Sequence, residues 1–502
     1  MLGLILVVSC QKDGEKDNHS GPPDIVFGEV FVGPGGDDYG PGTREEPWNH
    51  LAVAISRLGP GATLTILEGT YPYSRMIQAG IQGTPDSVIL IRGEPGREVI
   101  IDFSRADIGN SGSYPYTQGA IQITFASHVQ FRNLKIMNSH AAGFNISYSD
   151  HISIINCETE NTFSSGIAAW QHCSHITVMG NTIINANDPD MVWGGNFTGR
   201  EPPHEALSMA GPHYFEVAFN LIRDCRKEGI DVKETASFGL VHHNHVHHCD
   251  RQALYIDAWF GVLEDIGMYE NVAHHCEAGI AVSCEDGPVA RDLHIHHNLV
   301  YDNRATGLFM SRWGKDLTRE DVHITNNTFY RNGYGGSEQP DPDYWLTGGL
   351  YLFTTQLEDV VIRNNILSLN SPFEIGKSQD YGEGGLEERN ILIEYNLVHD
   401  VNTVPDPFYM WVWTKDSVYS ITGDPVIETE PLFVDAAGGD FRLQAGSPAI
   451  NAGHPDPRYN DPDGTRNDIG AFPYGSGEAY FWWKTGFPPL IDDPETWRDS
   501  SW

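Results

Sequence analysis

The sequence repeats a short pattern, and this repeat constrains the fold more than any other feature. Hexapeptides that open with Asn, most of which end in Asn or Cys, recur roughly 24–29 residues apart in the most regular region. They are NLKIMN at 133, NCETEN at 156, NTIINA at 181, NLIRDC at 220, NHVHHC at 244, NVAHHC at 271, NLVYDN at 298, NTFYRN at 327, NILSLN at 365 and NLVHDV at 396. After most of them comes a short alternating segment, such as GIDVK at 229 or ALYID at 253. A period of this size, with short strands and no helical spacing, predicts a parallel β-solenoid.

Successive coils of such a solenoid lie about 4.8 Å apart, so equivalent residues form ladders. An Asn at one position per coil can hydrogen-bond along the stack and satisfy backbone groups of the turns. A second ladder is predicted to hold Cys225, Cys249, Cys276, Asn138, Asn161, Asn303 and Asn332. Two states of its cysteines are open: buried thiols that pack like small hydrophobes, or disulfides between neighbouring coils.

The repeat style resembles the right-handed parallel β-helix of pectate lyases, polygalacturonases and chondroitinase B over roughly residues 120–400. The segment from residue 29 is similar to the N-terminal part of many bacterial β-helix enzymes, and its WNHLAVAISRL has helical apolar spacing. The segment EPLFVDAAGGDFRLQAGSPAINAG, followed by NDIGAFPY, resembles the tail of the same enzymes. The resemblance implies an all-β, single-stranded right-handed parallel β-helix, with an amphipathic helix near 48–58 capping its start.

The amino terminus, MLGLILVVSC, resembles a bacterial lipoprotein signal with Cys10 as the lipidated residue, and an export signal without lipid is the alternative. We therefore divide the chain into a signal (1–10), a flexible tether (11–27), the β-helix (28–430) and a C-terminal tail or cap (431–502). The protein is expected to be an exported monomer, lipid-anchored at the bacterial outer membrane, the cell surface or the periplasm. The net charge of −37 argues against nucleic acid and against membrane contact other than a lipid at Cys10.

Strand alternation predicts where the chemistry lies. In GIDVK, Ile230 and Val232 point into the solenoid while Asp231 and Lys233 point out. The same alternation one coil later places Tyr255 beside Asp231, and Asp257 beside Lys233. The outward cluster is predicted to comprise Trp170, Glu205, Glu228, Asp231, Lys233, Arg251, Tyr255, Asp257, Trp259, Glu285, Arg312 and Trp313. Such a face suits a polysaccharide, because sugar rings stack on aromatic side chains and hydroxyls need directed acceptors, whereas the plainer interpretation is a cross-strand ion pair on a solvated face.

Glycoside hydrolysis is the favoured chemistry, because it requires two carboxyl groups at a set separation. Asp231 and Asp257 lie one coil apart and two residues apart along the strand, so their Cα atoms are expected about 8 Å apart. In this interpretation they act as acid and base or nucleophile, Lys233 and Glu285 assist them, and no cofactor is needed. Sugar-binding groups are then Trp170, Glu205, Arg251, Tyr255, Trp259, Arg312 and Trp313. The substrate would be a plant or algal polysaccharide, including an acidic or sulfated one.

β-Elimination is the alternative chemistry. EGIDVK resembles chondroitinase B and alginate lyases, in which a Glu five residues before a Lys helps to hold calcium and the Lys acts as base. The resemblance implies Lys233 as base and Glu228, with Glu205, as calcium ligands. The sequence departs from that family one coil on, where the family's Arg is Asp257, and a carboxylate there raises the pKa of Lys233 and makes it a poorer base.

Two further predictions concern the rest of the surface. A non-catalytic glycan-binding or adhesin solenoid would carry monotonous outward ladders, but the outward side chains change coil by coil between 205 and 313, which favours an enzyme. The histidines from 242 to 297 are predicted to form stacked, solvent-facing imidazoles on a different face from the carboxylates.

Overall fold

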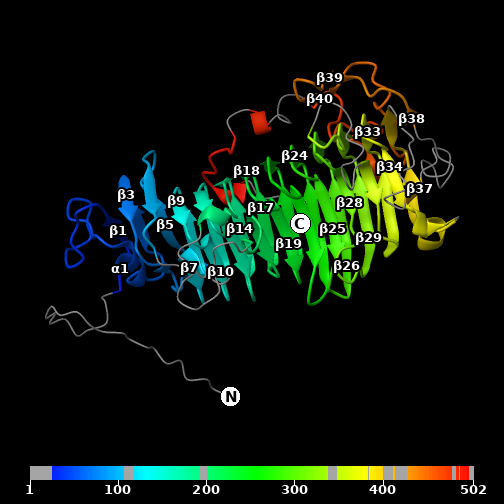
Figure 1. The fold of residues 1–502 in the computed structure, drawn as a ribbon. Coiled ribbons are helices and arrows are strands. Elements are labelled where there is room, and N and C mark those ends of the chain that lie inside the picture. The colour runs from blue at the N-terminus through cyan, green and yellow to red at the C-terminus, as the bar shows by residue number, and fades with distance from the viewer. Residues whose placement is uncertain are drawn as a thin grey trace.

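The computed structural model describes residues 25–106, 118–191, 201–336, 348–382, 384–399, 411–412, 427–476, 482–484 and 487–496. Cys10 and most of the predicted tether lie outside the described residues. The described chain winds into a parallel β-solenoid, as the repeat predicts, and it is the right-handed β-helix that the resemblance implies, with three long sheets along its axis (Figure 1). Among the described residues, no helix has the length and apolar character needed to cross a membrane.

Each coil contributes one strand to each sheet, and the strands of a sheet pair with the next coil in parallel. Sheet 1 runs through β1 (Glu29–Val32), β2 (Thr63–Ile66), β5 (Ile89–Gly93), β8 (Ser127–Arg132), β11 (Asp150–Ile155), β14 (Ser174–Met179), β17 (His213–Ala218), β20 (Ser237–His242), β23 (Leu263–Tyr269), β26 (Val289–His296), β29 (Thr318–Thr325), β32 (Leu357–Arg363) and β35 (Ile391–Glu394). Sheet 2 runs through β4 (Ile77–Gln78), β7 (Gly119–Thr124), β10 (Ala142–Ser147), β13 (Ile167–Trp170), β16 (Leu207–Ala210), β19 (Ile230–Glu234), β22 (Leu254–Ala258), β25 (Ile280–Cys284), β28 (Thr306–Met310), β31 (Gly348–Leu352), β34 (Ile375–Ser378) and the antiparallel β37 (Trp411–Val412).

Sheet 3 runs through β3 (Gly69–Pro72), β6 (Val99–Asp102), β9 (Lys135–Ser139), β12 (Glu158–Thr162), β15 (Thr182–Ile184), β18 (Leu221–Arg223), β21 (His245–His247), β24 (Val272–His274), β27 (Leu299–Tyr301), β30 (Thr328–Tyr330), β33 (Ile366–Ser368), β36 (Leu397–His399) and β38 (Ile427–Glu428). The hairpin β39 (Phe433–Asp435) and β40 (Asp440–Leu443) follows the coils. Short 3₁₀ turns complete the structure: η2 (Pro189–Met191), η3 (Gln379–Tyr381), η4 (Glu387–Arg389), η5 (Pro457–Tyr459) and η7 (Pro494–Thr496).

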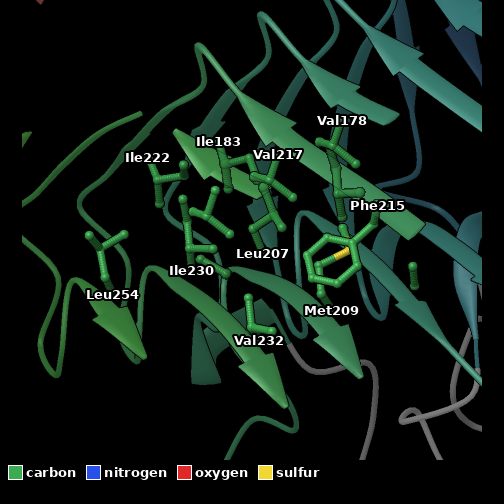
Figure 2. Packing of buried hydrophobic residues seen from close by; sticks show 14 of the residues in the cluster. Val178, Ile183, Leu207, Met209, Phe215, Val217, Ile222, Ile230, Val232 and Leu254 are labelled. Carbon is green, nitrogen blue, oxygen red and sulfur yellow. The ribbon is translucent and has the colours of Figure 1, made fainter. Parts of the chain in front are cut away.

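Aliphatic side chains from all three sheets fill the interior of the coils. Figure 2 shows Val217 of sheet 1, Val232 of sheet 2 and Ile222 of sheet 3 converging on the same space, and all three are fully buried. The residue before β19 must be Gly, because the chain passes close to its neighbour there. A Cβ atom on Gly229 would lie 2.4 Å from Val246 Cγ1. The alternation of buried and outward residues therefore follows the period of two that the sequence predicts.

An Asn ladder joins successive coils by hydrogen bonds, as the sequence predicts. In the first two hexapeptides, however, the predicted alignment is wrong by one residue. The ladder positions there are Leu134 and Cys157, which pair in register with Asn181 of the next coil. Asn133 and Asn156 precede them with φ of 53° and 51°. Asn tolerates the left-handed region, which explains its presence at both positions. The sequence motif therefore did not distinguish an Asn that forms ladder hydrogen bonds from an Asn that allows a positive φ.

The Cys ladder is a column of buried thiols. Cys225, Cys249 and Cys276 are free and fully buried, and the Cys249 N–H donates to Cys276 Sγ at 3.3 Å. The thiol interpretation is therefore confirmed over the disulfide one. The predicted alignment is wrong by one residue here too, because the column contains Ser139 and Thr162 rather than Asn138 and Asn161. The prediction is confirmed for Asn303 and Asn332, which continue the column.

A helix, α1 (Leu51–Ser56), lies within the segment predicted to be helical and is shorter than the sequence suggests. It buries Leu51, Ala54 and Ile55 in the core. Its role in capping the first coil stays a prediction.

The C-terminal residues run back over the outside of the coils, as the red segment in Figure 1 shows. Arg132 donates to the carbonyl of Ile491 at 2.6 Å, and Trp482 lies against His243 with ring centroids 5.6 Å apart. The predicted stacking of imidazoles is confirmed, with His247 and His274 rings 5.0 Å apart and nearly parallel. The prediction that these rings face solvent is wrong for His242, which is 2% exposed. His245 is partly covered beside Phe487, and burial lowers its pKa to about 3.

Removing one rung of the Asn ladder should destabilise the fold. Asn244 Oδ1 accepts from the backbone N–H and the side chain of Asn220, and its Nδ2 donates to Val217 O and Asn271 Oδ1. Asn244→Ala removes these four buried hydrogen bonds, so the free energy of unfolding should fall by about 2–3 kcal/mol in denaturant titration. Asn49→Ala, at a partly exposed site outside the ladder, is the control and should change it by less than about 0.5 kcal/mol. An equal loss in both variants would contradict the ladder's role.

Candidate functional site

Two outward ladders of sheet 2 carry the predicted cluster, and their register is as predicted. In the first, Ser208, Asp231 and Tyr255 are direct neighbours on β16, β19 and β22. In the second, Lys233 pairs with Asp257. That ladder continues to Ser283 on one side and, through Ala210, to Trp170 on the other: Trp170, Ala210, Lys233, Asp257 and Ser283.

The centre of the cluster is far less exposed than the sequence suggests. Asp231 is 1% exposed and Asp257 is 5% exposed. Tyr255 is also buried, with the Trp313 ring edge-on at 5.7 Å. The expectation of an open polar face is therefore wrong here: neighbouring side chains cover the carboxyl groups, and access is through their partly exposed partners.

Lys233 lies in a clamp of acidic groups. Its Nζ is 2.7 Å from Glu205 Oε1 and 3.6 Å from Asp231 Oδ2. Glu205 Oε2 accepts from the Ser208 hydroxyl at 2.8 Å, so both oxygens of Glu205 are engaged. Lys233 is thus held as the counter-ion of the neighbouring acidic side chains.

The charges of this network follow from burial and from the ion pair. Burial alone would raise the pKa of Glu205, but the Lys233 ammonium lowers it to about 2. Burial, followed by the Glu205 carboxylate, raises the pKa of Asp231 well above its ordinary value despite the opposing effect of Lys233. Burial alone would lower the pKa of Lys233, but Glu205 and Asp231 together raise it above its ordinary value. Glu205 and Lys233 therefore form the ion pair, and Asp231 holds a proton.

Asp257 and Glu285 form the other half of the cluster. Trp259 Nε1 donates to Asp257 Oδ2 at 2.5 Å, and the Tyr255 hydroxyl donates to Glu285 Oε1 at 2.7 Å. Burial, and next the Glu285 carboxylate, raise the pKa of Asp257 to about 8. The two groups therefore have different environments: Asp257 keeps its proton at neutral pH, and Glu285 accepts a hydrogen bond from a hydroxyl.

The other predicted residues are distributed along the same face. Arg251 bonds Glu228 Oε1 at 3.2 Å and also contacts Glu201, so it serves an ion-pair network at the side of the cluster. Arg312 is directed away, toward Asp380 at 2.7 Å. Trp170 lies two coils from Lys233 along the ladder and contacts His204. The structure thus brings together Glu205, Asp231, Lys233, Tyr255, Asp257, Trp259, Glu285 and Trp313, and leaves Trp170, Glu228, Arg251 and Arg312 at the periphery.

Sequence reasoning missed Glu234, which ends β19 next to Lys233. Strict alternation places this residue inward, but its φ of 64° turns the chain at that point. Burial raises its pKa, and the Lys233 ammonium opposes the shift. The signal was available in the sequence, since an acidic residue at an inward position predicts that the strand has ended.

Calcium would require oxygens that converge and lack partners. Glu228 Oε2, Asp231 Oδ1 and Asp257 Oδ1 are buried without a hydrogen-bond partner. However, within the described chain the acids of the cluster do not form a group of three whose ligand atoms lie within 4.8 Å of one another; the group that does is His128, Asp150 and His151. Glu205, whose two oxygens are engaged, and Glu228 therefore do not fit a preformed calcium site.

The proton on Asp257 predicts a pH effect on stability. A carboxyl group with a folded-state pKa of about 8 binds a proton on folding between about pH 4 and pH 8, so it lowers stability as the pH rises through that window. Asp257→Asn removes this dependence. Its melting temperature should therefore rise relative to the native protein from about pH 5 to about pH 8 in calorimetry, and the difference should level off above that pH. Asp321→Asn, on the exposed surface, is the control, and a constant difference for Asp257→Asn would contradict the prediction.

Comparison with known proteins gives two family matches. The family described as Pel9A-like, right handed beta helix region, matches residues 30–227, and the right handed beta helix region family matches residues 220–356. The uncharacterized protein YwoF of Bacillus subtilis is 25% identical over 497 residues, which cover 88% of this chain and 96% of that protein. Pectate lyase PEL9 of Emericella nidulans is 27% identical over 121 residues, 23% of this chain and 29% of that protein.

Among solved structures, the crystal structure of pectate lyase Pel9A is similar at 15% identity with a TM-score of 0.46, covering 90% of this chain and 98% of that one. The two family matches overlap at residues 220–227 and both describe a right-handed β-helix region. The chain belongs to the superfamily of right-handed parallel β-helix proteins.

Proposed function

We propose that this chain hydrolyses a polysaccharide at the sheet 2 cluster, with Asp257 as general acid and Glu285 as base or nucleophile. The observation that carries the proposal is the pairing of these two groups with neutral donors. Asp257 accepts a hydrogen bond from the indole of Trp259, and Glu285 accepts one from the hydroxyl of Tyr255. Glu205, in contrast, forms an ion pair with the Lys233 ammonium. Two carboxyl groups in different environments are what glycoside hydrolysis requires.

The roles follow from exposure and charge. Trp259 and Glu285 are partly exposed, so a sugar ring can reach them. Asp257 and Asp231 are both buried, but Asp257 is bonded to Trp259, whereas Asp231 lies beside the Lys233 ammonium. Asp257 would give its proton to the glycosidic oxygen, and Glu285 would act on the opposite side of the bond. Asp231, Lys233 and Glu205 would be positioning residues. Burial and the Glu285 carboxylate keep Asp257 protonated, and the Lys233 ammonium opposes this. This assignment moves the second carboxyl role from Asp231, the partner expected from spacing, to Glu285.

β-Elimination is the second candidate, since the similar proteins include pectate lyases. It would use Lys233 as base, which requires a neutral amine. The clamp of Glu205 and Asp231 disfavours that form, because it stabilises the ammonium. A calcium ion near Glu228 would supply charge to a uronic carboxylate in that chemistry, although the described acids do not converge on one point.

The setting of the enzyme is also a proposal. Its substrate would be a polysaccharide outside the cell, in keeping with the similarity of the amino terminus to an export signal. We further propose that Cys10 carries a lipid anchor and that the protein works as a monomer.

Analysis of the products tests the chemistry directly. The protein is incubated with a panel of plant and algal polysaccharides, and reducing ends and ultraviolet absorbance are followed together. Hydrolysis yields new reducing ends without absorbance, and elimination yields an unsaturated uronic end that absorbs. Absorbance rising in step with the reducing ends would overturn the hydrolase and establish the lyase.

Paired variants test the roles on whichever polysaccharide is cleaved. Asp257→Asn preserves shape but removes the proton donor, so kcat should fall by at least about 10²-fold. Lys233→Met is combined with Glu205→Gln, because removing Lys233 alone would leave the Glu205 charge buried without a partner. This double variant should retain much more activity than Asp257→Asn under hydrolysis, and none under elimination.

Two controls complete the series. Glu285→Gln should lose activity to a similar extent as Asp257→Asn, while Asp380→Asn, which removes the partner of Arg312, should be nearly neutral. If Asp257→Asn stays active while the Lys233→Met/Glu205→Gln variant is inactive, the hydrolase proposal is wrong and Lys233 is the base of an elimination.

A further inference from the structure

A groove of about 590 Å³ runs along the outer face of sheet 1, away from the sheet 2 cluster. Its floor is a row of outward residues from successive coils: Gln130, Ser153, Thr177 and Glu216. Pro494 and Glu495 of the returning C-terminal segment close one side. The groove therefore crosses at least four coils with the same spacing between its contact groups.

Stacked rings form the other side of the groove. His128, His151, His175, Tyr214 and Phe238 occupy equivalent positions, with neighbouring ring centroids 4.3, 4.2, 5.1 and 4.9 Å apart. Because the ring faces contact one another, their edges point outward. The His and Tyr edges carry nitrogen and hydroxyl groups, so the groove has polar hydrogen-bonding atoms on its wall as well as its floor.

These rings stand where aromatic residues are unfavourable. All five have φ between 51° and 55°, in the left-handed region. Gly, Asn, Asp and His adopt that region most readily, so it is the choice of Tyr214 and Phe238 that is unusual. Tyr214 is also 51% exposed and Phe238 is 38% exposed, so burial does not explain their choice.

The ring ladder ends where the groove ends. The position equivalent to Phe238 is Asp in each of the next four coils: Asp265, Asp292, Asp321 and Asp359. None of these four lines the groove. If stacking were needed only to hold the coils, it would serve those coils equally. On this ladder the aromatic residues therefore coincide with the coils that form the groove, although a second ring stack, of Phe125, Tyr148 and His172, lies outside it.

We propose that this groove binds a segment of a neutral, linear polysaccharide, independently of cleavage at sheet 2. Contact groups that repeat at the coil spacing of about 4.8 Å suit a polymer of identical hydroxyl-bearing units. No Lys or Arg is among the described residues that line it, and Glu216 and Glu495 are, so polyanions are disfavoured. An extended peptide is also disfavoured, because the backbone groups of a sheet face are already paired and only a sheet edge can add a strand.

The test uses Asn substitutions that suit the backbone. Native affinity electrophoresis is run with Asp257→Asn protein, which leaves the polymer intact, in gels containing xylan, galactomannan, hydroxyethyl cellulose or polygalacturonate. At least one neutral polymer should retard the protein. Adding Tyr214→Asn and Phe238→Asn should weaken that retardation at least tenfold in apparent Kd. Their melting temperature should not fall, because Asn takes the left-handed region readily.

Asp292→Asn is the matched control, since it lies at the same ladder position outside the groove, and it should bind like its parent. The proposal is overturned if no neutral polymer retards the protein, if only polygalacturonate does, or if Tyr214→Asn/Phe238→Asn binds unchanged. It is equally overturned if that variant loses its melting temperature along with binding, since the rings would then be structural. Because cleavage is not measured, these results leave the hydrolase proposal to its own test.

Discussion

The register between coils is the constraint on which the rest of this structure depends. Side chains alternate along a strand with a period of two, so a slip of one residue would turn every outward group inward. The Asn ladder prevents such a slip, because each Asn bonds both the backbone and the Asn of the next coil, as Asn220 does with Asn244. With the register fixed, Lys233 must lie beside Asp257 and Asp231 beside Tyr255. A reactive cluster can then be assembled from residues far apart in sequence without any loop that folds to position them.

The same register produces the unusual charge state of the cluster. Strands in neighbouring coils bring Asp231, Lys233 and Asp257 within a few ångströms, and Glu205 joins them from the residues just before β16. One ammonium cannot neutralise so many carboxylates in a buried setting. The lowest free energy therefore has one ion pair, Lys233 with Glu205, and protons on the carboxyl groups that lack a cation. A proton donor thus arises from a shortage of positive charge, without any group that is individually specialised for it.

Much of this could be predicted from sequence, and the failures have physical causes. Period and alternation predict the coils, the sheet 2 register and the central members of the cluster other than Glu234, because these depend on local spacing. The first two Asn hexapeptides were misaligned by one residue, because Asn133 and Asn156 are there for their left-handed backbone conformation and not for ladder hydrogen bonds. Burial of Asp231 and the covering of His245 by the tail depend on contacts between distant segments, which spacing does not encode. The ring ladder on sheet 1 carries no motif at all, and becomes visible only when equivalent residues of five coils are superimposed.

The net charge of −37 looks unfavourable for a protein that would handle acidic sugars, yet the charge at each site differs from the average. In the sheet 2 cluster the Lys233–Glu205 pair is neutral, and the pKa values of Asp231 and Asp257 are both raised, so only part of the carboxyl groups carry charge at neutral pH. Along sheet 1, by contrast, the groove has carboxylates and no described cation among its lining residues. The two faces therefore differ in their electrostatic fields: the cluster is partly neutralised, and the groove is lined by carboxylates without a described Lys or Arg. A solenoid can keep such fields apart because each sheet is a separate surface, while the shared coils hold both in one fixed geometry.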